Sequence, residues 1–341
     1  MSAVVFDNVS IVFGDAPQTA LPLMDQGQTR ADIQTATGQV LGVHDCSLQV
    51  DAGEILVLMG LSGSGKSTLL RAVNALNPVI RGKVQVHDGT QMVDVTHAPE
   101  ARLRHMRQHH IAMVFQQFGL LPWRTVRENV GLGLELGGMR KAARKAKVDA
   151  QLDLVALTDW AERKVGALSG GMQQRVGLAR AFATEAPILL MDEPFSALDP
   201  LIRTHLQDEL LALQSKLKRT IIFVSHDLDE AFKLGDRIAI MEGGRIVQTG
   251  KPQEIYSKPA NDYVAEFVAH MNPLGVLRAG DLAEPCDIAP ENTVGAEADI
   301  RCVMAKLGPT DHALGVVRNG HVIGQVTKDR VLEKLLDPRK A

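Results

Sequence analysis

The 341-residue chain has few cysteines, no long apolar run and little excess charge. Its three cysteines, Cys46, Cys286 and Cys302, are an odd number without CxxC or Cys/His metal spacing, which argues against a disulfide framework and fits a reducing cytosol. No apolar run approaches the ~18 to 20 residues that cross a bilayer, and the start, MSAVVFDNVS, lacks the basic and apolar regions of a secretory leader. We therefore expect any association with a membrane to come through partner proteins.

The overall charge gives no sign of a nucleic-acid partner. The net charge is -3, so nothing draws the whole chain toward nucleic acid or an anionic lipid surface. One cluster of Lys and Arg occupies residues 137–150 without interleaved aromatics, and we expect it to be a solvated helix face. Hydrophobic residues make up 45% of the chain and charged residues 23%, which is sufficient for one large and one small domain.

Short apolar runs separated by helical stretches organise the first two thirds of the chain. Residues 3–13 and 46–60 are expected to be strands, and the second ends at glycine. The runs ILLMDEP at 188–194 and TIIFVSHD at 220–227 have the apolar, partly β-branched character of parallel strands buried on both faces. This alternation predicts an α/β fold with a mostly parallel sheet, whose ligand sites lie beyond the carboxyl ends of its strands.

The remaining segments are less regular. Residues 15–40 form an insertion that could carry a short helix but has no clear period, and residues 118–168 are expected to be mainly helical. A turn-rich linker near residue 272 leads to a small C-terminal unit. There, two short strands joined across Asn319 and Gly320 predict a hairpin, which a helix at 329–336 follows.

The clearest chemical motif is GLSGSGKST at residues 60–68. It satisfies G-x-x-x-x-G-K-[ST] between a predicted strand and a predicted helix, which is the context that a phosphate-binding loop requires. Backbone N–H groups and the helix dipole would face the phosphates, while Lys66 reaches the β- and γ-phosphates and Ser67 offers its hydroxyl to Mg²⁺. A purely structural glycine turn is the alternative. The expected nucleotide-binding residues here are Gly60, Leu61, Ser62, Gly63, Ser64, Gly65, Lys66, Ser67 and Thr68.

Two carboxylates follow the apolar run at 188–191. A carboxylate at the end of a buried strand is costly unless it serves a cation or accepts hydrogen bonds. Asp192 is therefore expected to help hold Mg²⁺, and Glu193 is the candidate general base that activates the attacking water. The alternative is that the pair caps a turn or a helix.

A second anion site is predicted in ALSGGMQQRVGLARA at residues 167–181, where Ser169 and two glycines open a helix. A bare helix N-cap is the alternative. The sequence L-S-G-G-x-Q-x-x-R-V closely resembles the signature of ABC ATPases and lies shortly before Asp192, as that family places it. The resemblance implies that the phosphate loop of one subunit and the signature of its partner enclose each ATP, so that the working unit is a homodimer. The signature residues are Ser169, Gly170, Gly171 and Gln173.

Further residues match the family in chain order. The resemblance implies that Gln116 senses the γ-phosphate and Mg²⁺, that Asp199 couples the two sites of the dimer, and that His226 contacts the γ-phosphate. Phe13 sits where the family places an aromatic side chain that stacks on adenine, although a core phenylalanine is the alternative. The implied catalytic residues are Glu193, His226 and Lys66, and the implied Mg²⁺ ligands are Ser67, Gln116 and Asp192.

The resemblance covers about residues 3–260 and extends to one branch. The segment FGLLPWRTVRENV at 118–130, together with the insertion, looks like the ATP subunits of importers for choline, glycine betaine or proline. The resemblance implies permease subunits, an extracytoplasmic substrate-binding protein and a place on the cytoplasmic face of the cell membrane. Trp123 and residues 120–121 are candidates for the permease contact, with ordinary core packing as the alternative.

We therefore expect residues 1–271 to form an ABC ATPase domain with a P-loop NTPase core, an N-terminal antiparallel β region and a helical subdomain at about 118–170. Residues 272–341 should be a linker and a small α+β unit, of which 311–336 look like part of a CBS module. One alternative is an importer ATPase for proline or another amino acid. A non-transport ABC ATPase of DNA repair or translation is another, but such proteins usually carry paired cassettes, a coiled-coil insertion or zinc cysteines. A regulatory, ligand-binding role for the C-terminal unit is compatible with an importer ATPase.

Overall fold

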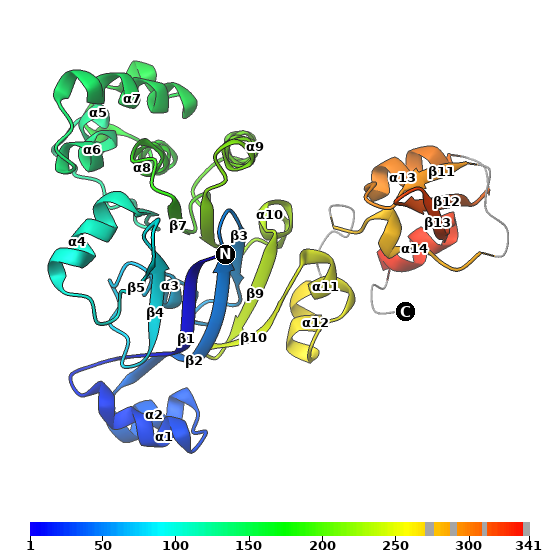
Figure 1. Cartoon of the computed structure of the whole chain (residues 1–341), viewed down its shortest axis with the longest axis horizontal. Helices are drawn as coiled ribbons and strands as arrows, with labels where there is room; N and C mark the ends of the chain where they lie inside the picture. Colours follow the sequence, from blue (N-terminus) through cyan, green and yellow to red (C-terminus); the bar gives the residue numbers. More distant parts are fainter. Residues whose placement is uncertain (270–275, 287–291, 309–311, 337–341) are drawn as a thin grey trace. The chain divides into compact units, whose positions relative to one another are not determined.

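The computed structural model describes residues 1–269, 276–286, 292–308 and 312–336. The chain divides into two compact units, Met1–His226 with Met241–Ile246, and Asp227–Ile240 with Val247–Ala341 (Figure 1). The predicted domain boundary at residues 271 and 272 lies outside the described residues. Among the described residues, no helix is both long and apolar enough to cross a membrane.

An antiparallel sheet opens the first unit, as the sequence predicted. Its strand order is β2-β1-β4-β5, and β1 pairs with both β2 and β4. The expectation of one strand over 46–60 is wrong, because the chain turns after Asp51 through Gly53 at φ +79° and begins a strand of another sheet at Ile55. The strands are β1 Ser2–Phe13, β2 Val40–Asp51, β4 Arg81–His87 and β5 Met92–Asp94.

A six-stranded sheet in the order β10-β9-β3-β8-β7-β6 carries the predicted parallel core. The pairs β3/β8, β7/β8 and β6/β7 are parallel, and every residue of β3, β7 and β8 is buried. Their carboxyl ends therefore meet at one edge. The strands are β3 Ile55–Met59, β6 Ile111–Val114, β7 Ile188–Asp192, β8 Thr220–Val224, β9 Arg237–Glu242 and β10 Arg245–Gly250.

Helices flank the core and form the predicted helical region. Figure 1 shows α5, α6, α7 and α8 grouped together, and α8 packs against both α5 and α7. The basic cluster falls mostly on α7, which buries Val148 and Leu152 and leaves its lysines toward solvent. The helices of this unit are α3 Lys66–Leu70, α4 Glu100–His109, α5 Val126–Val130, α6 Leu132–Leu136, α7 Lys141–Leu154, η2 Thr158–Trp160, η3 Val165–Ala167, α8 Gly170–Ala183 and α9 Pro200–Leu217.

The insertion after β1 is mostly helical. It contains η1 Pro17–Ala20, α1 Leu21–Asp25 and α2 Arg30–Thr37. Met24 and Ile33 are buried in one cluster with apolar residues of β1 and β2, so the insertion has a small core of its own against the antiparallel sheet.

The second unit ends in a small α+β fold. A three-stranded sheet in the order β11-β12-β13 contains the predicted hairpin, which turns at Asn319 (φ 52°) and Gly320 (φ 80°). Both residues have the positive φ that a tight hairpin turn requires. The elements are α10 Leu228–Leu234, α11 Pro252–Ser257, α12 Asp262–Val268, η5 Ala279–Asp281, β11 Thr293–Gly295, α13 Ile300–Leu307, β12 Leu314–Arg318, β13 His321–Val326 and α14 Lys328–Leu336.

Candidate nucleotide site

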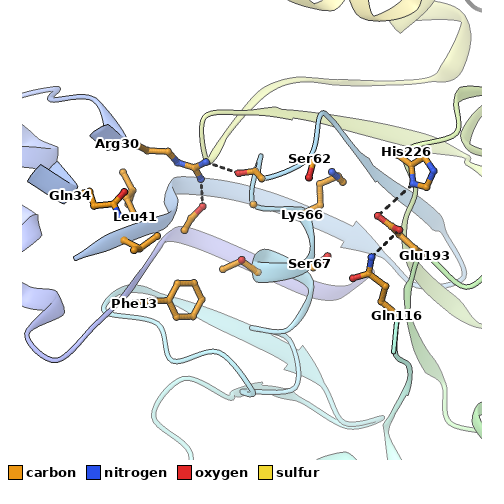
Figure 2. A pocket seen from close by; sticks show the side chains of 15 residues that line it. Phe13, Arg30, Gln34, Leu41, Ser62, Lys66, Ser67, Gln116, Glu193 and His226 are labelled. Carbon is orange, nitrogen blue, oxygen red and sulfur yellow. Dashed lines mark hydrogen bonds and ion pairs between the residues drawn. The ribbon is translucent and has the colours of Figure 1, made fainter. Parts of the chain in front are cut away.

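A cavity of about 670 Å³ collects most of the residues that the sequence singled out. Figure 2 shows the phosphate loop in its middle, Phe13 at one end and Gln116, Glu193 and His226 at the other. The lining residues are Phe13, Arg30, Gln34, Val40, Leu41, Gly42, Ser62, Gly63, Gly65, Lys66, Ser67, Thr68, Gln116, Glu193 and His226.

The phosphate loop joins the end of β3 to the start of α3. Its lysine, Lys66, is only 6% exposed, and its Nζ donates hydrogen bonds to the carbonyls of Gly60 (2.8 Å) and Leu61 (2.9 Å). Burial lowers the pKa of Lys66, whereas the nearby carboxylates of Glu193 and Asp192 act in the opposite direction. The ammonium is thus held over the loop by backbone oxygens, which an anionic ligand can replace.

Asp192 at the end of β7 is fully buried, and its carboxylate has two partners. Ser67 Oγ donates to one oxygen at 2.6 Å, and Arg71 Nη2 donates to the other at 2.9 Å. The arrangement satisfies the buried charge and fixes the direction of the Ser67 hydroxyl. Asp192 therefore bonds the phosphate loop rather than capping a helix.

Glu193 follows Asp192 in an uncommon backbone conformation, with φ at +49°. Its N–H donates to the carbonyl of Val224 at the end of β8, at 3.1 Å. Gln116 Nε2 donates to Glu193 Oε2 at 3.1 Å, and His226 Nδ1 lies 3.5 Å from Oε1 (Figure 2). Three segments that follow neighbouring parallel strands thus bring an amide, a carboxylate and an imidazole together. Strained backbone at such a point is typical of functional sites.

Phe13 lies at the other end of the cavity. The residue is 38% exposed, so it is not a core phenylalanine. A Cβ at Gly42 would lie 2.9 Å from Phe13 Cε2, closer than real Cβ atoms approach, and a tight 3.0 Å from Thr68 Cγ2. The glycine therefore makes room for the ring beside the phosphate loop. Stacking on adenine stays a prediction.

The signature and the residue assigned to dimer coupling lie outside the cavity lining. Ser169 is the N-cap of α8, where its Oγ accepts a hydrogen bond from Met172 N at 3.4 Å, and Gln173 Nε2 donates to Leu168 O. Asp199 is the N-cap of α9 and accepts from Ile202 N at 3.1 Å. Within one chain these residues cap helices, and their part in a partner's site stays a prediction.

Sequence reasoning missed two groups of residues. Arg30 and Gln34 of α2 line the cavity, but they come from the insertion, for which the sequence predicted a possible short helix and no function. Arg180 of α8 donates to the carbonyls of Phe118 and Gly119, both at 2.7 Å, and so ties the signature helix to the loop after Gln116. Burial lowers the pKa of Arg180. Arg180 lies within the predicted signature segment, but nothing in the sequence indicates that it contacts the loop after Gln116.

Comparison with known proteins agrees with this geometry. Residues 43–196 match the family model described as ABC transporter, and the chain belongs to the family of ABC transporter ATP-binding subunits. It is thus an ATPase coupled to transport, built on the ABC cassette fold.

Among its relatives, the glycine betaine/proline betaine transport system ATP-binding protein ProV of Escherichia coli is 51% identical over 81% of this chain and 68% of its own length. The glycine betaine/carnitine transport ATP-binding protein GbuA of Listeria monocytogenes is 43% identical, covering 96% and 81%. The trimethylamine N-oxide transport system ATP-binding protein TmoW of Ruegeria pomeroyi is 42% identical, covering 96% of each chain.

The solved structures give the same result for the fold. The dimeric structure of MJ0796, a bacterial ABC transporter cassette, matches with a TM-score of 0.63 and 29% identity, over 73% of this chain and 98% of that one. A second dimeric structure of the same cassette, in a post-hydrolysis state bound to ADP and Pi, matches equally well.

Proposed function

We propose that this chain hydrolyses ATP to power the uptake of a small methylated amine, with glycine betaine and proline betaine as the best-supported cargoes. The observation that carries the proposal is the 51% identity to the betaine subunit of Escherichia coli, together with the full-length similarity to a trimethylamine N-oxide subunit. The named cargoes share a methylated nitrogen. Choline, which the sequence also suggested, is named by none of the three relatives described above, and the transport names of those relatives disfavour a role in DNA repair or translation.

The chemistry follows from the two ends of the cavity. Lys66 and the backbone N–H groups of the phosphate loop bind the β- and γ-phosphates, while Phe13 stacks on the base. Glu193 accepts a proton from the attacking water as general base, because its carboxylate is directed into the cavity by Gln116 and His226. His226, exposed beside it, stabilises charge that develops on the γ-phosphate.

The residues present fit a magnesium ion. Ser67 and Gln116 offer a hydroxyl and an amide oxygen to the cavity, and Asp192 binds the Ser67 hydroxyl from behind. Hard oxygen donors of this kind suit Mg²⁺, which usually keeps several waters and binds phosphates. When bound, Mg²⁺ supplies positive charge that neutralises the transferred phosphate. Each Asp192 oxygen accepts one hydrogen bond and keeps a further lone pair, so Asp192 orients the Ser67 hydroxyl and can also help to hold the ion.

A homodimer completes the site. The signature residues of one chain lie outside its own cavity, at the exposed N-terminus of α8, where N–H groups and a helix dipole favour an anion. We assign them to the ATP held by a second copy of the chain. The dimeric cassettes that match this fold support the arrangement.

A second, apolar groove is the proposed docking site for a permease helix on the cytoplasmic face of the membrane. It has a volume of about 310 Å³ and lies next to the loop after Gln116, with Leu76 and Leu136 exposed along it. Trp123 is exposed, so it is not packed in the core; it is not among the lining residues of this groove and stays a separate candidate for the permease contact. A substrate-binding protein would deliver the cargo to the permease from the other side.

Uptake by whole cells tests the cargo. Cells that lack this chain and carry its permease would receive wild type or Lys66→Ala, and uptake of labelled glycine betaine, proline betaine, trimethylamine N-oxide, choline and proline would be compared. We expect wild type alone to restore betaine uptake. Restoration of proline uptake without betaine uptake would show that the cargo is an amino acid and not a methylated amine.

A further inference from the structure

The insertion of residues 15–40 contributes a wall to the nucleotide cavity. Its helix α2 begins at Arg30, directly after the N-cap Thr29, which forms a reciprocal capping box with Asp32. Ile33, on a neighbouring face of the helix, is fully buried in the small core against β1 and β2. Residues four apart share one face of a helix, so Arg30 and Gln34 point the same way, and both line the cavity (Figure 2).

Arg30 joins the phosphate loop to the antiparallel sheet. Its Nη1 donates to the carbonyl of Gly63 at 2.6 Å, and its Nη2 donates to the carbonyl of Gly42 in β2. Gly63 has φ at +77° in the turn of the phosphate loop, and Gly42 lies beside Phe13. The guanidinium also requires a glycine at position 244, because a Cβ there would lie 2.6 Å from Nη2. The Arg30 side chain therefore fixes the backbone of the phosphate loop and the backbone next to Phe13 at the same time.

The charge of Arg30 has no carboxylate partner among the described residues, and its hydrogen bonds go to neutral carbonyls. A half-buried cation at the rim of a cavity for a polyphosphate raises the affinity for the anion. Gln34, one turn further, is exposed and makes no side-chain hydrogen bond within the described part of the chain. Its amide can both donate and accept, which suits the hydroxyls of a sugar or the edge of a base.

We propose that α2 is part of the ATP site: Arg30 is a positioning residue that holds the phosphate loop for nucleotide binding, and Gln34 contacts the sugar or base. The inference rests on the proposed assignment of the cavity to ATP. It gives the insertion a function in nucleotide affinity, apart from hydrolysis, which takes place at the opposite end of the cavity. Removing Arg30 should therefore change KM much more than kcat.

The test compares steady-state hydrolysis and calorimetric MgATP binding for the full chain and four variants. We expect Arg30→Ala to raise KM and Kd about 10-fold while kcat stays within about twofold, because the cavity loses a positive charge and the phosphate loop loses the contacts that hold it in place. Arg30→Lys keeps the positive charge but lacks the fork that binds the carbonyls of Gly63 and Gly42 together, so it should recover part of the loss. Gln34→Ala should raise KM about 3-fold, the usual effect of one neutral hydrogen bond.

Asp25→Ala is the matched control, because it breaks the other tether of the insertion, the exposed ion pair with Arg81. A KM increase in Asp25→Ala equal to that in Arg30→Ala would reduce Arg30 to an anchor of the insertion and overturn the inference. A wild-type KM in Arg30→Ala would also overturn the inference. If Arg30→Ala does not fold, a wild-type KM in both Arg30→Lys and Gln34→Ala would overturn it. Absence of MgATP binding by the wild type would instead refute the assignment of the cavity, on which the inference depends.

Discussion

Glu193→Gln separates ATP binding from hydrolysis. The replacement has the same shape, and its amide oxygen can still accept the hydrogen bond from Gln116 that Glu193 Oε2 accepts at 3.1 Å. What disappears is the carboxylate that we propose to take a proton from water. General base catalysis contributes about 10²- to 10⁴-fold, so kcat should fall by at least ~100-fold while the Kd for ATP stays within about threefold.

The measurement combines phosphate release, calorimetric ATP binding and size-exclusion chromatography in MgATP. Because the variant cannot complete the cycle, we expect it to elute as a nucleotide-bound dimer, whereas wild type returns to the monomer as ATP is consumed. Glu185→Gln is the matched control, since Glu185 is exposed and pairs with Lys147 away from the cavity. Turnover of Glu193→Gln at the wild-type rate would refute the role of the carboxylate, and loss of ATP binding would show that the charge serves the fold of the loop.

Two further predictions concern buried groups. Arg71→Ala leaves the fully buried carboxylate of Asp192 with one partner. A broken buried pair typically costs about 3 to 5 kcal/mol, but Arg71 is 36% exposed, so we expect the free energy of unfolding in guanidinium to fall by about 2 kcal/mol. Lys147→Ala, which breaks an exposed pair, should cost under about 1 kcal/mol. Equal losses in the two variants would contradict this reading. Burial raises the pKa of the Cys46 thiol to about 12, so the native protein should be alkylated at exposed Cys302 and not at Cys46. Since the folded pKa lies above the unfolded value, this thiol contributes stability that is fully present below about pH 8.5 and declines as the pH rises toward 12, which alkaline melting curves of wild type and Cys46→Ala would reveal.

The phosphate loop and the parallel core could be predicted because their signals are local. A buried apolar run, a glycine-rich turn and a helix start follow one another within residues 55–70, and each is specified by its own residue types. The division of residues 46–60 was missed for the same reason: apolar alternation continues through the turn at Gly53, and only sheet pairing separates the strands on its two sides.

The insertion could not be predicted in the same way. Its helices are short and depend on contacts of Met24 and Ile33 with strands that lie elsewhere in the sequence. The role of Arg30 depends on backbone carbonyls 12 and 33 residues away, and backbone oxygens carry no sequence signal at all. A site built from side chains can be found by motif, whereas one built from main-chain acceptors becomes visible only in three dimensions.

The tie between Arg180 and the carbonyls of Phe118 and Gly119 has a mechanical consequence. Helix α8 has Ser169 at its beginning and Arg180 near its end, and its 14 residues give a rigid rod of about 20 Å. We therefore expect a displacement of the loop after Gln116 to be transmitted along α8 to the signature at its N-terminus. With the permease and dimer contacts proposed above, movement of that loop and closure over the second subunit's ATP would be coupled, and loss of the Arg180 contacts would let ATP hydrolysis proceed without transport.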